Sequence, residues 1–146
     1  MILGFEKNEY ATYYIEYRLV FCTRRSRKIF KFASIRKDFK EALVEICNKH
    51  NFQLISADTK DYTADLRIKC NCDYSPKQLH QIIRKESTKI LAEKHPEIIT
   101  SKSIWTKNFF VTTNYTINCD DIIADYIESQ KLPSILVIFS LACRLL

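Results

Sequence analysis

Basic side chains are concentrated near the N-terminus of the 146-residue chain. Positions 18–40 hold nine of them against one acidic residue, Asp38: Arg18, Arg24, Arg25, Arg27, Lys28, Lys31, Arg36, Lys37 and Lys40. A second basic set is spaced along positions 77–89: Lys77, Arg84, Lys85 and Lys89. Clustered lysines and arginines bind nucleic-acid phosphates by releasing condensed counterions. The clusters therefore predict a nucleic-acid partner; the alternative is a solvated basic face.

The composition points the same way and excludes some other functions. The formal net charge is +6, from 23 basic and 17 acidic side chains, which favours a polyanionic partner. Gly4 is the only glycine, so no glycine-rich loop can cradle a nucleotide phosphate, and we expect no small-molecule substrate. Aromatic residues in the expected strands either stack on unpaired bases or belong to the core: Tyr13, Tyr14, Tyr17, Phe109 and Phe110.

Six cysteines raise the question of disulfides or zinc. Positions 1–10 lack the long apolar stretch of a signal peptide, which predicts a cytoplasmic protein with reduced thiols. Three cysteines in or beside apolar segments are expected to be buried: Cys22, Cys47 and Cys119. Cys70 and Cys72 resemble half of a zinc site, but the other half is missing, so we interpret them as thiols at a strand end.

Hydrophobic periodicity predicts the elements that must position these residues. Strands are expected at 14–22, 52–57 and 62–70, with a fourth inside 104–113. Helices are expected at 34–49, from 76 to about 95, and at 120–130, with Ser34 and Ser75 as caps for the first two. The order β-α-β-β-α-β-α predicts an α+β, ferredoxin-like sandwich: a four-stranded antiparallel sheet with two helices on one face, plus a C-terminal helix.

The chain length predicts one domain, residues 1–133, followed by an apolar tail, residues 134–146. The tail is shorter than the roughly 20 residues of a membrane span, so membrane insertion is not expected. We interpret it as an element docked on the domain. The alternatives are a dimer contact or a lipid-facing segment, and the first would make the chain a structural or interaction protein.

The strand at 62–70 carries a second set of chemically active side chains. Its alternation places Ala64, Leu66 and Ile68 on one face and therefore Thr63, Asp65 and Arg67 on the other. The polar face thus presents a hydroxyl, a carboxylate and a guanidinium in a row. Arg67 is placed to pair with Asp65 or to hold a phosphate.

Four segments in consistent order together resemble one family, the single-tyrosine HUH transposases of the insertion sequence 200/605 type. They are the strand and basic turn from Tyr17 to Phe30, the stretch Arg84-Lys85-Glu86-Ser87-Thr88, the segment from Trp105 through Phe109-Phe110-Val111-Thr112-Thr113, and Asp125-Tyr126-Ile127-Glu128-Ser129-Gln130. The resemblance covers about residues 14–131. It implies the ferredoxin-like fold, a homodimer, and recognition of hairpin or single-stranded DNA.

The resemblance also implies a chemistry. Tyr126 corresponds to the family's nucleophile, which attacks a DNA phosphate to form a phosphotyrosine link, and Gln130 to a ligand of its magnesium or manganese ion. A spacing of four on a helix puts both on one face, as that chemistry requires. The family's two metal-binding histidines, however, are absent. Thr63 and Asp65 stand in their place.

Two interpretations follow for the reaction. In the one we favour, strand cleavage is lost or weakened and the scaffold still binds DNA. In the other, Asp65, Gln130 and Thr63 form an all-oxygen magnesium site and the enzyme is active. A third possibility is an RNA-binding module on the same fold. The predicted DNA-binding residues are Arg24, Arg25, Arg27, Lys28, Arg67, Arg84 and Lys85.

Overall fold

The computed structural model describes residues 4–99, 103–113 and 119–131. Its main sheet has the strand order β4-β5-β3-β6, and every neighbouring pair is antiparallel. The strands are β3 (Ile15–Cys22), β4 (Gln53–Lys60), β5 (Thr63–Cys70) and β6 (Phe110–Thr112). The helices are α1 (Ala33–His50), α2 (Pro76–Lys94) and α3 (Asp120–Lys131). This confirms the predicted α+β, ferredoxin-like fold.

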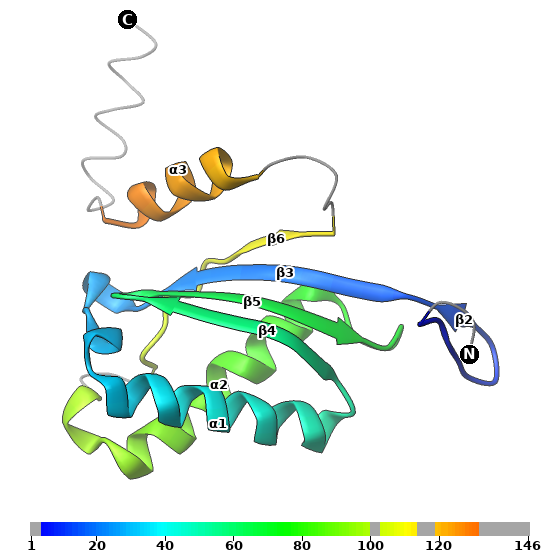
Figure 1. Cartoon of the computed structure of the whole chain (residues 1–146), viewed down its shortest axis with the longest axis horizontal. Coiled ribbons are helices and arrows are strands. Elements are labelled where there is room, and N and C mark those ends of the chain that lie inside the picture. The colour runs from blue at the N-terminus through cyan, green and yellow to red at the C-terminus, as the bar shows by residue number, and fades with distance from the viewer. Residues whose placement is uncertain (1–3, 100–102, 114–118, 132–146) are drawn as a thin grey trace, which may run out of the picture.

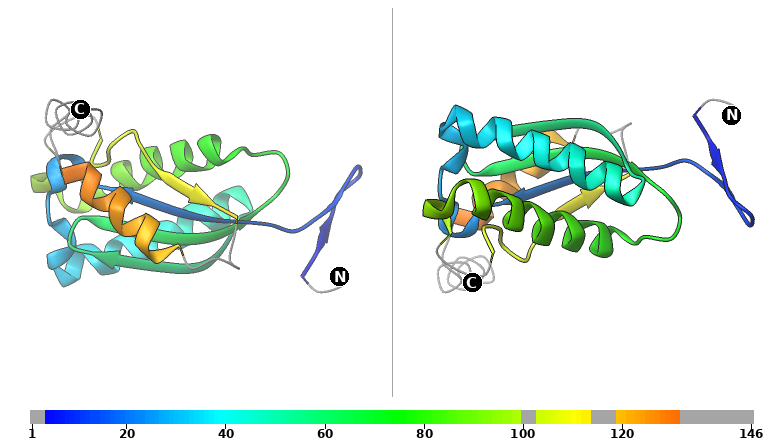
Figure 2. Two further views of the ribbon diagram at one scale, coloured as in Figure 1. Left: turned by 90° about the horizontal axis from the view of Figure 1, so that it is seen from above. Right: turned by 90° about the horizontal axis from the view of Figure 1, so that it is seen from below.

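The sheet separates two layers of helices (Figure 1). Helices α1 and α2 cover one face, whereas α3 lies over the opposite face, as the views from above and below also show (Figure 2). Helix α3 therefore covers the sheet face that points away from α1 and α2. The polar residues of β5 lie on that same face, because the alternate residues Ala64, Leu66 and Ile68 are fully buried in the main core.

Trp105 anchors the connection between α2 and β6 in the main core. Its side chain is fully buried, and its indole Nε1 donates a hydrogen bond of 2.9 Å to the Ser87 hydroxyl on α2. Its ring packs edge-on against Phe21, with centroids 4.7 Å apart. An isolated β-bridge joins Trp105 to Thr23, directly after β3. The segment around Trp105 therefore holds the start of the basic turn against α2.

The two long helices begin differently. Ser75 caps α2 as predicted, in a capping box with Gln78: Ser75 Oγ accepts from the Gln78 amide at 3.2 Å, and the Gln78 side chain accepts from the Ser75 amide at 2.8 Å. The predicted Ser34 cap is wrong. The cap position of α1 lies two residues earlier, at Phe32, which makes no side-chain cap hydrogen bond. The preceding short helix η2 (Ile29–Lys31) leads directly into α1, so Ser34 falls inside its first turn.

The basic turn after β3 folds into the short 3-10 helices η1 (Arg24–Ser26) and η2, and a third, η3 (Pro96–Ile98), follows α2. A two-stranded hairpin, β1 (Glu6–Lys7) with β2 (Thr12–Tyr13), was not predicted from the sequence. It extends beyond the end of the main sheet (Figure 2). Strands β4 and β6 also differ in length from the prediction, the first longer and the second confined to three residues.

The predicted burial of three cysteines is confirmed. Cys22, Cys47 and Cys119 are buried, and no disulfide joins any of the five described cysteines. Residues 132–146 lie outside the described part, so the apolar tail 134–146 and the domain boundary at 133 stay predictions. Among the described helices, none has the length and apolar character needed to cross a membrane.

Candidate functional site

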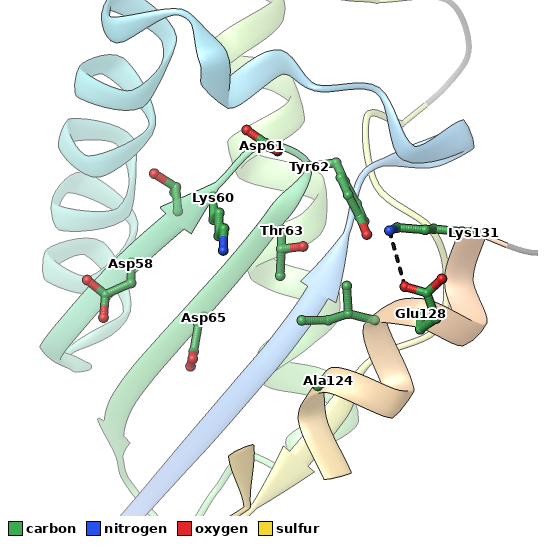
Figure 3. A pocket seen from close by; sticks show the side chains of 11 residues that line it. Asp58, Lys60, Asp61, Tyr62, Thr63, Asp65, Ala124, Glu128 and Lys131 are labelled. Atoms are coloured by element: carbon green, nitrogen blue, oxygen red, sulfur yellow. Dashed lines mark ion pairs between the residues drawn. The ribbon is translucent and has the colours of Figure 1, made fainter. Parts of the chain in front are cut away.

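The sheet face under α3 holds the candidate reaction residues, as the alternation of β5 predicted. Next to Thr63 and Asp65, a cavity of about 520 Å³ lies between α3 and the end of the β4–β5 hairpin. Figure 3 shows its side chains, with Asp58 and Asp65 on neighbouring strands and Glu128 on α3. Glu128 pairs with Lys131 at 3.1 Å. The cavity is lined by both signs of charge, which makes it neither a basic nor a purely acidic pocket.

Asp65 has a dedicated partner, Arg18 on the adjacent strand β3. Arg18 Nε donates to Asp65 Oδ1 at 3.0 Å, and Nη2 donates to Oδ2 at 2.7 Å. This bidentate geometry is the strong form of an arginine–carboxylate pair. The hydrogen bond to Asp65 raises the pKa of Arg18, against the opposing effect of burial. The sequence interpretation had offered Arg67 as the partner, but Arg18 supplies the guanidinium seen bidentate on Asp65.

Strand register explains why Arg18 reaches Asp65. Asp65 lies directly opposite Val20, and Arg18 lies two residues along β3 on the same face. Long side chains bridge such diagonal positions in antiparallel sheets. Arg18 also lies 3.9 Å from Asp120 at the start of α3. The ion pair therefore links the sheet to the first turn of the helix above it.

Thr63 faces a thiol. Its hydroxyl lies 3.9 Å from Cys22 Sγ on β3, and both residues are buried. Burial raises the pKa of the Cys22 thiol, and the contact with Thr63 lowers it by a smaller amount. Thr63 is thus packed where β3 and β5 meet.

Tyr126 is packed against the sheet. Its ring lies against Phe110, with centroids 6.0 Å apart, in a small apolar cluster built on Val20, Cys119 and Ile123. Its hydroxyl is buried and has no hydrogen-bond partner in the described part of the chain. Burial raises the pKa of Tyr126, and the nearby Cys22 adds to this effect. A phenol so placed ionises with difficulty, which disfavours it as a nucleophile in this conformation.

Gln130 lies one turn after Tyr126 and is half-buried. Its amide nitrogen donates to Ser129 Oγ at 3.3 Å. Each of the three candidate metal ligands thus has a separate contact within the protein. Asp65 is held by Arg18, Thr63 by its place beside Cys22, and Gln130 interacts locally. Among the described residues, no group of three His, Cys, Asp or Glu side chains could hold a metal ion. Thr63, Asp65 and Gln130 would offer one carboxylate, already paired with Arg18, and two neutral oxygens, and this donor set does not fit a divalent cation.

The basic turn divides into anchored and exposed side chains. Arg24 Nε donates to the Trp105 carbonyl at 3.1 Å, and Arg27 donates to the Ile98 carbonyl. Arg25 and Lys28 are exposed. The turn is thus held against the segments that follow α2, with two of its cations displayed to solvent.

The second helix brings Arg84 to the same place. Arg84 Nε is buried and has no hydrogen-bond partner in the described residues. Burial lowers the pKa of Arg84, and the charge of Arg24 lowers it further, so Arg24 lies within electrostatic range of Arg84. The next residue, Lys85, is exposed. Of the predicted DNA-binding residues, the structure joins Arg24 and Arg84. It places Arg67 elsewhere, on β5 opposite Arg18.

Sequence reasoning missed the roles of two residues. Arg18 was counted only as part of the basic segment, although the alternation of side chains along β3 places it on the same sheet face as Val20. His80 was not assigned a role; it is 2% exposed, and its Nε2 has no partner among the described residues. His80 precedes Arg84 by four residues on a predicted helix, and this spacing could have shown that the two side chains share a face.

A profile of the family described as "Transposase IS200 like" matches residues 11–130. The chain therefore belongs to this family of transposases, which confirms the resemblance carried by the four segments. No curated protein matches the chain.

Two solved structures share the fold. A candidate transposase from Deinococcus radiodurans R1 superposes with a TM-score of 0.79 at 16% identity, over 88% of this chain and 99% of that one. A REP-associated tyrosine transposase bound to a REP hairpin gives a TM-score of 0.51 at 15% identity, over 83% of this chain and 70% of that one. At these identities the likeness establishes the fold.

Proposed function

We propose that this transposase-family protein recognises hairpin or single-stranded DNA and that its strand-cleavage activity is lost or weakened. The observation that carries the proposal is the bidentate ion pair between Arg18 and Asp65. It occupies the position at which the family resemblance implies a metal ligand. A carboxylate already neutralised by a guanidinium has little charge left to attract a magnesium ion.

The proposed loss of cleavage follows from what phosphoryl transfer needs. The attacking oxygen must ionise, and the charge that develops on the phosphorus oxygens must be stabilised, usually by a metal. The pKa of Tyr126 is raised by burial, and the donor set under α3 does not fit a metal. Magnesium or manganese would supply that stabilisation only if Asp65 were released from Arg18.

Support for DNA binding comes from another part of the molecule. The exposed cations Arg25 and Lys28 and the clustered Arg24 and Arg84 supply phosphate-binding groups. A REP-associated relative of the same fold is seen with a REP hairpin, which supports a hairpin as the ligand.

The family resemblance further supports a homodimer. Sedimentation at micromolar concentration would test this, and a monomer mass would contradict it.

The test uses a fluorescent DNA hairpin with a single-stranded flank, with magnesium or manganese present. We expect saturable binding by anisotropy and no covalent protein–DNA adduct on a denaturing gel, in the wild type and in Tyr126→Phe alike. An adduct formed by the wild type and lost in Tyr126→Phe would overturn the proposed loss of cleavage. Preference for an RNA hairpin of matched sequence would overturn DNA as the ligand.

A further inference from the structure

The most unusual charge arrangement in the described residues is the meeting of Arg24 and Arg84 without a carboxylate. Neither guanidinium forms an ion pair within the described part of the chain. A backbone carbonyl holds the Arg24 side chain, and helix α2 holds the backbone of Arg84. Arg24 donates to the Trp105 carbonyl, and Arg84 lies on α2 one turn before Thr88, whose hydroxyl donates to the Arg84 carbonyl at 2.8 Å.

The Trp105 segment joins the elements that carry the two arginines. Trp105 donates through its indole to Ser87 on α2, and the Ile104 amide donates to the Thr88 hydroxyl at 3.4 Å. The Arg24 amide in turn donates to the Ile104 carbonyl at 2.8 Å. Arg24 and Arg84 are therefore attached to one rigid framework. Two like charges held together in this way repel unless an anion lies between them.

Two buried polar atoms in this region have no partner. Arg84 Nε and His80 Nε2 are both buried and both unpaired in the part of the chain that the structure describes. The two residues are four apart on α2, so they share a face one turn apart. His80 is 2% exposed and lies between two aromatic rings. Its ring stacks on Phe109 with centroids 4.3 Å apart and packs edge-on against Phe21 with centroids 5.0 Å apart. Buried polar atoms without a partner are costly, and functional sites account for many of them.

We propose that Arg24 and Arg84 together hold a single phosphate group of the bound nucleic acid, with His80 supplying a further hydrogen bond from beneath. The proposal rests on the proposed DNA-binding function and makes it more specific. A planar guanidinium binds phosphate oxygens with two parallel N–H groups, which an ammonium cannot do. This site therefore differs from Arg25 and Lys28, whose exposed charges attract the whole phosphate backbone without selecting one position.

The first test compares Arg84→Gln, Arg84→Lys and Lys85→Gln for binding to the labelled hairpin. A phosphate clamp predicts at least a tenfold loss of affinity for Arg84→Gln, little rescue by Arg84→Lys, and a two- to threefold loss for Lys85→Gln. Equal losses for Arg84→Gln and Lys85→Gln, with wild-type affinity kept by Arg84→Lys, would overturn the clamp, because a diffuse field responds only to charge. The melting temperature of Arg84→Gln should stay level or rise, since the change removes a like charge and an unpaired buried donor. A fall would overturn the proposed absence of a partner.

The second test locates the phosphate. Each phosphate of the hairpin is replaced in turn by an uncharged methylphosphonate. We expect one position to weaken wild-type binding about tenfold and to have no effect in Arg84→Gln. Equal sensitivity at all positions, or an unchanged profile in the variant, would contradict the clamp.

Inorganic phosphate separates failure of the clamp from failure of the proposed function. If the wild type binds no DNA hairpin, the proposed function fails, but the clamp is still tested by a phosphate titration followed by ¹⁵N NMR of the Arg84 Nε–H and the His80 ring. Saturable shifts in the wild type that vanish in Arg24→Gln would support the clamp. No shift of either signal would overturn it.

Discussion

The two charged regions of this molecule differ in how their charges are compensated. Under α3, Asp65 is paired with Arg18 in two hydrogen bonds, so the charge of this carboxylate is neutralised from within the protein. Between η1 and α2, Arg24 and Arg84 lie together without a carboxylate in the described residues. A region that satisfies its own charges needs no ligand, whereas one that gathers like charges is completed by an anion. The comparison supports the proposal that DNA binding outlasts strand cleavage on this scaffold.

The difference also separates stability from function. The Arg18–Asp65 pair contributes to folding, because both groups are removed from much of the solvent by β3, β5 and the start of α3. Arg84 opposes folding, because its buried Nε lacks a partner. Residues that destabilise a fold and remain in it are often those that bind a ligand. Substitutions in the two regions should therefore have opposite effects on stability.

The largest expected effect is at the paired region. Arg18→Met should lower the free energy of unfolding by about 2–3 kcal/mol, because it leaves the Asp65 carboxylate partly buried and unpaired. The value lies below that for a fully buried pair, since the two side chains are 17% and 28% exposed and solvent screens the remaining charge. Urea unfolding at pH 7 measures the change.

The matched control is the double variant Arg18→Met with Asp65→Leu. Removing both charges should restore most of the lost stability, because an apolar pair of similar size replaces the ion pair. If the free energy of unfolding of Arg18→Met lies within about 0.5 kcal/mol of the wild-type value, the ion pair is not compensating a buried charge. The contrast between the two regions then fails.

The second prediction concerns pH and the unpaired region. Burial, and secondly the charge of Arg84, lowers the pKa of His80 to about 4, whereas an unfolded histidine titrates near 6.5. Between these values the unfolded chain binds a proton that the folded protein excludes. Stability is therefore complete above about pH 6.5 and falls as the pH drops toward 4, by roughly 1–2 kcal/mol between pH 7 and pH 5.

His80→Gln isolates this contribution. Other titrating groups act in both proteins and cancel when the two stability–pH curves are subtracted. The difference curve should be flat above pH 6.5 and should slope below it in favour of the variant. A slope of the opposite sign would mean that His80 gains a proton on folding, and the region would then contain a compensating carboxylate.

Sequence periodicity was sufficient for the elements that carry the site. The alternation of β5 predicted its polar face, and the Ser75–Pro76 pair predicted the start of α2. Short elements were missed, since two-residue strands such as β1 and β2 carry no measurable period. The end of β4 was missed because Thr59 and Lys60, on an edge strand, look like loop residues in sequence.

Charge pairing could not be predicted, for a different reason. Arg18 and Asp65 are 47 residues apart, and alternation assigns each to a face without fixing the register between their strands. Arg67, two residues from Asp65 on one strand, was the nearer candidate in sequence, whereas the observed partner comes from the next strand. Arg24 on η1 and Arg84 on α2 are brought together because Trp105 contacts both elements. The sequence around either arginine does not reveal this contact.

The smallest expected effect tests the Tyr126 hydroxyl, a buried group under α3 without a partner in the described residues. Tyr126→Phe removes a buried hydroxyl that has no partner in the described residues, so it should raise the free energy of unfolding by about 1 kcal/mol. Tyr126→Leu should lower it instead, because it also removes the ring that packs against Phe110. Thermal unfolding of both variants separates the hydroxyl from the ring. A loss of stability in Tyr126→Phe would show that the hydroxyl forms a hydrogen bond, and the paired region would then hold a polar group poised for chemistry. A gain would mean that the hydroxyl is kept at a cost to the fold.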